Sequence, residues 1–209
     1  YKNRIYKVRK IKDLKNMNRK KLIICSTGLP SSGKGVILKV IKNLNIPNFI
    51  MGDVVRKKAS ENNISMDGAD GVGKFIIDYR KNNGKEIFAK EISKLIQNIK
   101  NEIVYIDGVR CKEETRHFNN LGWDVITISV LSPTKLRLKR IKNRKRGDTE
   151  ISHEKLIERD SKEIDVGISH VIMYSDHYLI NQDKSENEFM AEAKKLLIKI
   201  IDEYKNERN

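Results

Sequence analysis

A short glycine-rich segment, residues 28–35, constrains the fold of this chain more than any other part of its sequence. It follows the apolar run 22–25 and precedes residues 36–41, in which apolar side chains recur at helical spacing. At a junction of strand and helix, glycines let backbone N–H groups turn inward around an anion, and a lysine reaches the outer phosphates. The sequence therefore predicts a phosphate-binding loop. Its predicted contacts are Gly28, Leu29, Pro30, Ser31, Ser32, Gly33, Lys34, Gly35 and Val36.

The loop departs from its usual pattern directly after the lysine. That position ordinarily holds Ser or Thr, whose hydroxyl binds Mg²⁺, whereas here Gly35 stands there and Val36 follows. A magnesium ion would have to be held by other side chains or through water. The alternative, an ordinary glycine-rich turn, gives no reason for Lys34.

A second apolar segment, 103–106, ends in an acidic residue, Asp107. In phosphate-loop enzymes such a strand places a carboxylate beside the metal or its water, so we predict that Asp107 positions Mg²⁺ through water. Gly108 allows a ligand to approach the backbone closely, and Arg110 adds a fixed cation near the same edge.

Residues 48–51 are predicted to form a short strand that delivers Asp53 and Arg56 to the carboxyl edge of the sheet, where ligands bind in α/β proteins. Asp53 either caps the following helix or contacts a ligand. Residues 60–73 are rich in Asn, Asp, Gly and Ser, which predicts a mobile loop. Helices are predicted over 74–80 and 85–100, the second with a core stripe of Ile87, Phe88, Ile92, Leu95, Ile96 and Ile99.

Ser132 and Pro133 are typical of a helix start. The helix after them carries Arg137, Arg140 and Arg144 at spacings of three and four residues, which places these arginines on one face. Its other basic residues are interpreted as a solvated face, but this stripe can close over a polyphosphate. A further helix is predicted over 152–165, with Ile151, Leu156, Ile157 and Ile164 facing the core.

Five apolar or β-branched segments alternate with helical patterns along the chain. This alternation predicts one α/β domain with a parallel sheet and helices on both of its faces. A capping box at 185–188 begins the last helix. The predicted strands lie near 22–27, 48–51, 103–107, 124–131 and 177–181.

The net charge of +15 raises the question of a nucleic-acid partner. Much of the charge lies at one end, because residues 1–21 hold ten Lys or Arg and one acid. No aromatic or RNA-binding motif accompanies it, so residues 1–20 are interpreted as a basic extension, of which 1–16 lie outside the catalytic fold. The alternative is an arm that contacts RNA. The predicted domain is 21–209.

No apolar run approaches the roughly 18 residues that cross a bilayer, and the basic start lacks the apolar part of a secretory signal. We therefore expect no membrane partner. Cys25 and Cys111, the two cysteines, fit a reducing compartment and a cytoplasmic protein.

Taken together, these motifs resemble the nucleoside monophosphate kinase group of phosphate-loop enzymes. The loop at 28–35 is similar to that of adenylate kinases, which also have Gly directly after the lysine. Residues 52–56 resemble the "GD-x-x-R" motif, whose arginine holds the acceptor phosphate, and residues 106–110 resemble "LDGFPR" without its proline. The pattern from residue 21 onward is also similar to an archaeal branch of predicted nucleotide kinases related to adenylate kinase and dephospho-CoA kinase.

The resemblance implies a P-loop NTPase three-layer sandwich of sheet order 2-3-1-4-5, with an acceptor-binding segment near 53–84 and a short lid near 137–165. It also implies ATP, Mg²⁺ and a small phosphorylated acceptor such as a nucleoside monophosphate. The roles it carries over are catalysis for Lys34, Asp107, Arg140 and Arg159, donor binding for the loop, Arg144 and Asn181, and acceptor binding for Asp53, Arg56, Arg80 and Arg110.

Two alternatives remain. The first is a dephospho-CoA kinase-like transfer to a ribose hydroxyl, for which Asp53 is the candidate base. The second is an NTP-binding ATPase that acts in the assembly of RNA or ribosomes, with the basic N-terminus as its tether. Arg56 and Arg110 favour an acceptor that carries a phosphate.

Overall fold

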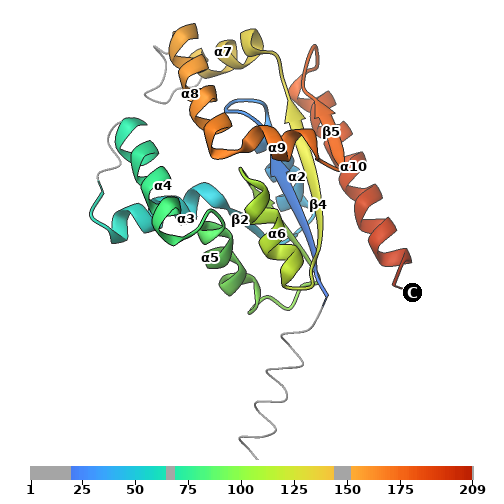
Figure 1. The fold of residues 1–209 in the computed structure, drawn as a ribbon. Helices are drawn as coiled ribbons and strands as arrows, with labels where there is room; N and C mark the ends of the chain where they lie inside the picture. The colour runs from blue at the N-terminus through green and yellow to red at the C-terminus, as the bar shows by residue number, and fades with distance from the viewer. Residues whose placement is uncertain (1–19, 65–68, 144–151, 209) are drawn as a thin grey trace, which may run out of the picture.

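The computed structural model describes residues 20–64, 69–143 and 152–208 of the chain (Figure 1). The predictions made for the basic extension, for Arg144 and for Ile151 therefore lie outside the described residues.

A parallel sheet of five strands forms the centre of the described part of the chain. Its order is β2-β3-β1-β4-β5, and every neighbouring pair is parallel. The predicted sheet and its order are confirmed. β1 begins with four apolar residues in a row, 22–25, because helices cover both of its faces and bury it completely. The strands are β1 (Leu22–Thr27), β2 (Asn48–Ile50), β3 (Ile103–Asp107), β4 (Asp124–Leu131) and β5 (His177–Ile180).

Helices cover both faces of this sheet, so the fold has three layers (Figure 1). One face packs on α2 and α10, and the other on α3, α5, α6 and α9. The first group comprises α2 (Lys34–Asn43) and α10 (Glu186–Asn206). The remaining helices are α3 (Met51–Glu61), α4 (Ala69–Asn83), α5 (Ile87–Ile96), α6 (Lys112–Asn120), α7 (Thr134–Lys142), α8 (His153–Val166) and α9 (Ile168–Met173).

The alternation of side chains along the strands divides the core between these layers. Leu22 and Ile24 of β1 pack in the cluster that holds Phe189 of α10, whereas Ile23 and Cys25 pack in the opposite cluster. All are at most 1% exposed. Burying each large apolar side chain contributes roughly 1.5–3 kcal/mol, so the two clusters hold the strand ends in fixed positions.

The carboxyl ends of the strands meet at one edge of the sheet, beside α7 and α8 (Figure 1). α8 begins at the N-cap Ser152, whose hydroxyl accepts the N–H of Lys155. α10 begins with the predicted capping box, in which Ser185 and Glu188 accept each other's backbone N–H groups. The predicted start of the last helix is thus confirmed.

The predicted mobile loop over 60–73 is wrong at both of its ends. α3 continues to Glu61, and α4 begins at Ala69. Asn63 ends the turn after α3 in a left-handed conformation (φ 56°), which asparagine tolerates. α4 forms in spite of its polar composition because Phe75 and Ile76 pack against the core.

Three residues that were predicted to face the core are exposed. Leu95, Ile157 and Ile164 are 50%, 42% and 48% exposed, respectively. In α8 the buried face is formed instead by Leu156 and, one turn later, by Asp160. The apolar pattern predicted isoleucines on the buried face of α8. Asp160 lies there because it pairs with the buried Arg137.

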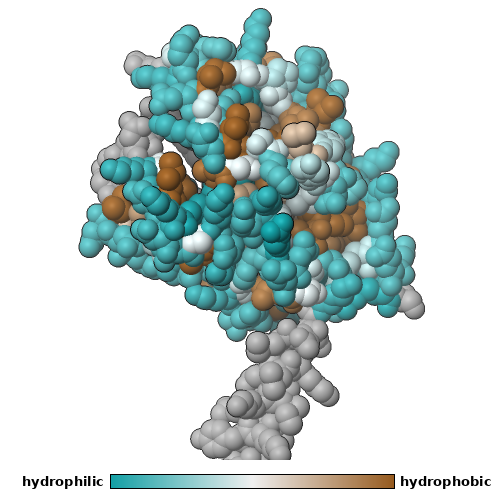
Figure 2. Space-filling view, viewed as in Figure 1, coloured by the Kyte–Doolittle hydropathy of each residue, from teal (hydrophilic) through white to brown (hydrophobic). Residues whose placement is uncertain are grey.

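No helix within the described ranges is both long and apolar enough to cross a bilayer. The face shown in Figure 2 is largely hydrophilic, with separate hydrophobic patches.

Candidate active site

The glycine-rich loop joins β1 to α2 at the carboxyl edge of the sheet. Gly28 and Gly33 have φ values of 142° and 118°, which favour glycine. A Cβ atom at Gly33 would also lie 2.1 Å from Nδ2 of Asn181, and one at Gly28 would lie 2.5 Å from the carbonyl oxygen of Val130. Only glycine fits this loop at both positions.

Lys34 is the first residue of α2, and its side chain turns back over the loop. Its Nζ donates to the carbonyl oxygens of Gly28 (2.6 Å) and Leu29 (3.2 Å). The ammonium group thus lies across the mouth of the loop, beside the positive end of the α2 dipole. A loop of this form offers an anion one positive charge and the N–H groups of a helix N-terminus.

Arg140 of α7 holds the outer side of the loop. Its guanidinium donates to the carbonyl oxygens of Ser31 (3.4 Å) and Ser32 (3.2 Å), and to Oδ1 of Asn181 (2.9 Å). The Asn181 amide donates in turn to the Ser32 carbonyl at 2.9 Å. Arg140 and Asn181, which lie 41 residues apart, therefore meet at the loop.

Arg137 was predicted to form a stripe with Arg140 that closes over a polyphosphate, and it lies elsewhere. Its side chain is 2% exposed and forms a two-pronged ion pair with Asp160 of α8, at 2.8 and 2.6 Å. It also donates to the Pro30 carbonyl oxygen at 3.3 Å. Arg137 thereby ties α7 and α8 to the loop, and its charge is neutralised within the protein.

Asp107 ends β3 directly beside the end of β1, where its register partner is Ser26. The Ser26 hydroxyl donates to Oδ1 of Asp107 at 2.7 Å and accepts a hydrogen bond from the buried Tyr105 hydroxyl, also at 2.7 Å. Burial raises the pKa of Tyr105 well above its usual value, so its hydroxyl keeps its proton. This chain of donors fixes the orientation of the Asp107 carboxylate.

The side chains near the loop fit a metal ion that keeps most of its water. Asp107 offers a second oxygen beyond the one that Ser26 contacts. Gly35 and Val36 offer no hydroxyl, and no cluster of three or more His, Cys, Asp or Glu was found within the described residues. A single carboxylate suits Mg²⁺, which sheds water reluctantly.

Three predicted acceptor residues lie on two different elements at this edge. Asp53 and Arg56, in the first turns of α3, form an exposed ion pair with each other. Arg110, in the turn after β3, forms an ion pair with Glu163 of α8 at 2.6 Å. In this structure each of these cations is therefore bound by a carboxylate.

Arg80, also predicted to contact an acceptor, is instead buried in the core. The residue is 7% exposed and lies over the Phe88 ring. Its Nη2 donates to Oε1 of the fully buried Glu114 at 2.6 Å. Burial raises the pKa of Glu114, while Arg80 and the backbone N–H of Arg110 act in the opposite direction. Arg80 supports the Arg110 turn from behind.

Two predicted site residues remain, Arg159 and Arg144. Arg159 lies on α8, next to Asp160, and engages in interactions of its own. Arg144 falls outside the described residues.

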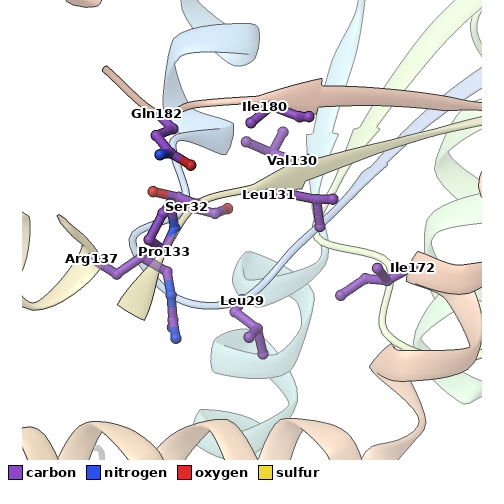
Figure 3. A pocket seen from close by; sticks show the side chains of 10 residues that line it. Leu29, Ser32, Val130, Leu131, Pro133, Arg137, Ile172, Ile180 and Gln182 are labelled. Atoms are coloured by element: carbon purple, nitrogen blue, oxygen red, sulfur yellow. The ribbon is translucent and has the colours of Figure 1, made fainter. Parts of the chain in front are cut away.

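Two hollows lie near Arg137 and Arg140 of α7, and one of them is lined in part by the loop. One of about 360 Å³ is lined by α7 and by the segment after β5, including Arg140, Asn143, Asp183 and Lys184. The other, of about 280 Å³, lies behind the loop (Figure 3). Figure 3 shows that its lining is mostly apolar, with Leu29 of the loop, Leu131 of β4 and Ile172 of α9 around it.

Both cysteines are free thiols that lie buried in the fold. Burial raises the pKa of the Cys111 thiol to about 12 and raises that of Cys25 as well. Both side chains therefore remain protonated packing groups.

Sequence reasoning missed the residues that hold the predicted ones in place. Ser26 and Tyr105 orient Asp107, Asp160 neutralises Arg137, and Glu114 and Glu163 bind the Arg110 turn. Ser26 could have been found, because it is the first polar residue after the apolar run 22–25. The acids of α6 and α8 carry no such signal, since charged residues are ordinary on helices.

Comparison with known proteins adds three findings. Residues 27–157 match the model of a family described as the AAA domain. A UPF0200 protein from Thermoplasma volcanium is 37% identical over 84% of this chain and 96% of its own length. A UPF0200 protein from Sulfurisphaera tokodaii is 39% identical over 86% of this chain and 97% of its own length.

Solved structures resemble this one at low sequence identity. TT1252 from Thermus thermophilus superposes with a TM-score of 0.64 at 13% identity, over 86% of this chain and 97% of that one. Shikimate kinase from Bacteroides thetaiotaomicron gives 0.60 at 11% identity, over 87% and 98%. A gluconokinase from Sinorhizobium meliloti gives 0.53 at 10% identity, over 91% and 98%. These likenesses concern the fold alone.

Proposed function

This chain belongs to the UPF0200 family and carries the AAA domain, and from that premise we propose that it transfers a phosphoryl group from ATP to a small acceptor, a nucleoside monophosphate or a related compound. The observation that carries the proposal is the placing of Lys34 and Asp107. Asp107 ends β3, and Lys34 follows the loop after the neighbouring parallel strand β1, so both lie at the same edge of the sheet. A lysine in a phosphate loop and a carboxylate on the adjacent strand are the two parts that phosphoryl transfer requires.

The donor would occupy the loop. Lys34 would exchange its contacts with the Gly28 and Leu29 carbonyls for the outer phosphates, and the N–H groups at the start of α2 would surround them. The hollow of about 360 Å³ beside Arg140 and Lys184 is the proposed place of the donor base. Arg140, fixed by Asn181, would present its guanidinium plane to that base.

Mg²⁺, when bound, would neutralise charge on the phosphates. The chain's own contribution is to position Asp107 through Ser26 and Tyr105, as described above. Arg56 and Arg110 would exchange their carboxylate partners for the acceptor, and Arg159 would add positive charge on the α8 side. The chemistry would then consist of positioning and electrostatic stabilisation.

Replacing Ser26 by alanine is expected to weaken the affinity of the ATP-bound protein for Mg²⁺ about tenfold, because residues that orient a metal ligand have effects of this size. A calorimetric titration with Mg²⁺ at saturating ATP measures it. Ser93→Ala is the matched control, since Ser93 is also a buried serine but contacts Lys90 and His117 on α5 and α6. An unchanged Mg²⁺ affinity in Ser26→Ala would show that the Ser26 hydrogen bond does not position Asp107 for the metal.

The proposal is tested by incubating the purified chain with Mg²⁺-ATP and a panel of nucleoside monophosphates, deoxynucleotides and dephospho-CoA. Release of ADP and the phosphorylated product are measured together. Transfer to one nucleotide supports the proposal and names the acceptor. Transfer to dephospho-CoA would favour a ribose hydroxyl, with Asp53 as base. ADP release without a phosphorylated acceptor would leave an ATPase, and stimulation by RNA would then point to the basic N-terminus.

A further inference from the structure

Arg110 is built as a receptor for an oxyanion. Its backbone N–H donates to Oε2 of Glu114 at 2.8 Å, and the other oxygen of that carboxylate is held by Arg80. Glu114 is fully buried, so the turn that carries Arg110 has little freedom to move. The side chain of Arg110 is 29% exposed and reaches out from this support. A guanidinium fixed in this way is suited to bind a carboxylate or a phosphate with directed hydrogen bonds.

Glu163 already occupies this receptor. Its Oε2 lies 2.6 Å from Nε of Arg110, and its side chain is 16% exposed. The carboxylate therefore stands in for the oxyanion that a ligand would bring. The side chains of Arg110 and Glu163 remain 29% and 16% exposed, so a competing anion can reach the pair and displace this carboxylate.

The position of Glu163 on α8 links this receptor to the loop. Asp160, one turn earlier on the same helix, holds Arg137, which contacts the Pro30 carbonyl of the loop. α8 thus presents one carboxylate to an arginine on the donor side and a second to an arginine on the acceptor side.

We propose that Glu163 competes with the acceptor for Arg110 and thereby selects an acceptor that carries a phosphate monoester. The inference rests on the proposed function and names the acceptor class of the same site. At neutral pH a phosphate monoester carries about 1.5 to 2 negative charges and can bind an arginine through two oxygens, so it displaces a single carboxylate. A neutral hydroxyl compound has no charge with which to displace Glu163. Only a strongly anionic acceptor therefore replaces the Glu163 carboxylate at Arg110.

The test is direct binding of inorganic phosphate, with the donor site saturated by a non-hydrolysable ATP analogue. Calorimetry compares the original chain with Glu163→Gln, which removes the negative charge and keeps the shape. The dissociation constant for phosphate is expected to fall about fivefold, the size of an ion pair of this exposure. Glu158→Gln is the matched control, because Glu158 lies on the same helix in an exposed pair with Lys162. It is expected to leave phosphate binding unchanged.

A double-mutant cycle assigns the effect to Arg110. In an Arg110→Ala background, Glu163→Gln is expected to change phosphate binding by less than about 1.5-fold, because the competed partner is gone. The proposal is overturned if Glu163→Gln binds phosphate no tighter than the original chain, if neither binds it, or if the gain persists without Arg110.

These results do not depend on turnover. If Glu163→Gln binds phosphate fivefold more tightly but the chain transfers no phosphoryl group, the competition at Arg110 is supported and the proposed kinase activity is refuted. If the chain transfers a phosphoryl group to a nucleotide but Glu163→Gln binds phosphate no more tightly, the kinase activity is supported and the competition at Arg110 is refuted.

Discussion

Replacing Lys34 by alanine is expected to lower phosphoryl transfer by at least about 100-fold, the usual effect of removing a fixed group that stabilises developing charge. Lys34 is the one loop residue whose charge crosses the mouth of the loop, where its Nζ lies 2.6 Å from the Gly28 carbonyl. Its loss should not affect the fold, because Lys34 is only half-buried and its ammonium group contacts carbonyl oxygens of the loop. Turnover is measured with the acceptor that the panel identifies.

Lys39→Ala is the matched control for this variant. Lys39 lies on the same helix, α2, and its partner is the exposed Glu186 at the start of α10. Transfer by Lys39→Ala should stay within about twofold of the original, since exposed pairs contribute little. Both variants should keep the original circular dichroism spectrum and unfolding temperature. Full activity in a folded Lys34→Ala protein would show that the loop does not bind the donor.

Replacing Asp160 by alanine is expected to lower the free energy of unfolding by about 3–5 kcal/mol, because it leaves the buried charge of Arg137 without its partner. The two side chains are 2% and 8% exposed, and they join through two hydrogen bonds. A loss of this size is a large part of the total stability of a domain, which is typically 5–15 kcal/mol. Urea unfolding followed by circular dichroism measures it.

Two further variants test whether the loss of stability in Asp160→Ala comes from the unpaired buried charge of Arg137. Glu158→Ala on the same helix breaks an exposed pair and should change the stability by less than about 1 kcal/mol. The double variant Arg137→Met with Asp160→Leu removes both charges and should recover most of the loss, since apolar residues can replace a buried pair. If Asp160→Ala were no less stable than Glu158→Ala, the pair would not hold α7 and α8 to the loop.

The parts that sequence reasoning predicted are those coded by neighbouring residues. Three features were identified from spacing alone, because each is encoded by a few consecutive residues. They are the loop, the strand that ends in Asp107 and the start of α10. The sheet order followed from the resemblance, and the structure confirms it. The loop over 60–73 was mispredicted because its polar composition gave no sign that Phe75 and Ile76 of the following segment are packed in the fold.

The parts that could not be predicted depend on contacts between distant segments. Arg137 and Arg140 are alike in sequence, but the first meets Asp160 and the second meets Asn181. No spacing rule distinguishes them, because the partners lie 23 and 41 residues away. The same holds for Arg80, which a buried glutamate draws into the core.

The hydrogen bonds from α7 fix the shape of the loop before the proposed nucleotide binds. Arg137 and Arg140 bind the carbonyl oxygens of three successive loop residues, Pro30, Ser31 and Ser32, from outside. A chain that is already held in its bound shape loses little conformational entropy when its ligand enters. The loop is therefore preorganised, and the proposed binding of a nucleotide would cost little free energy for ordering its backbone.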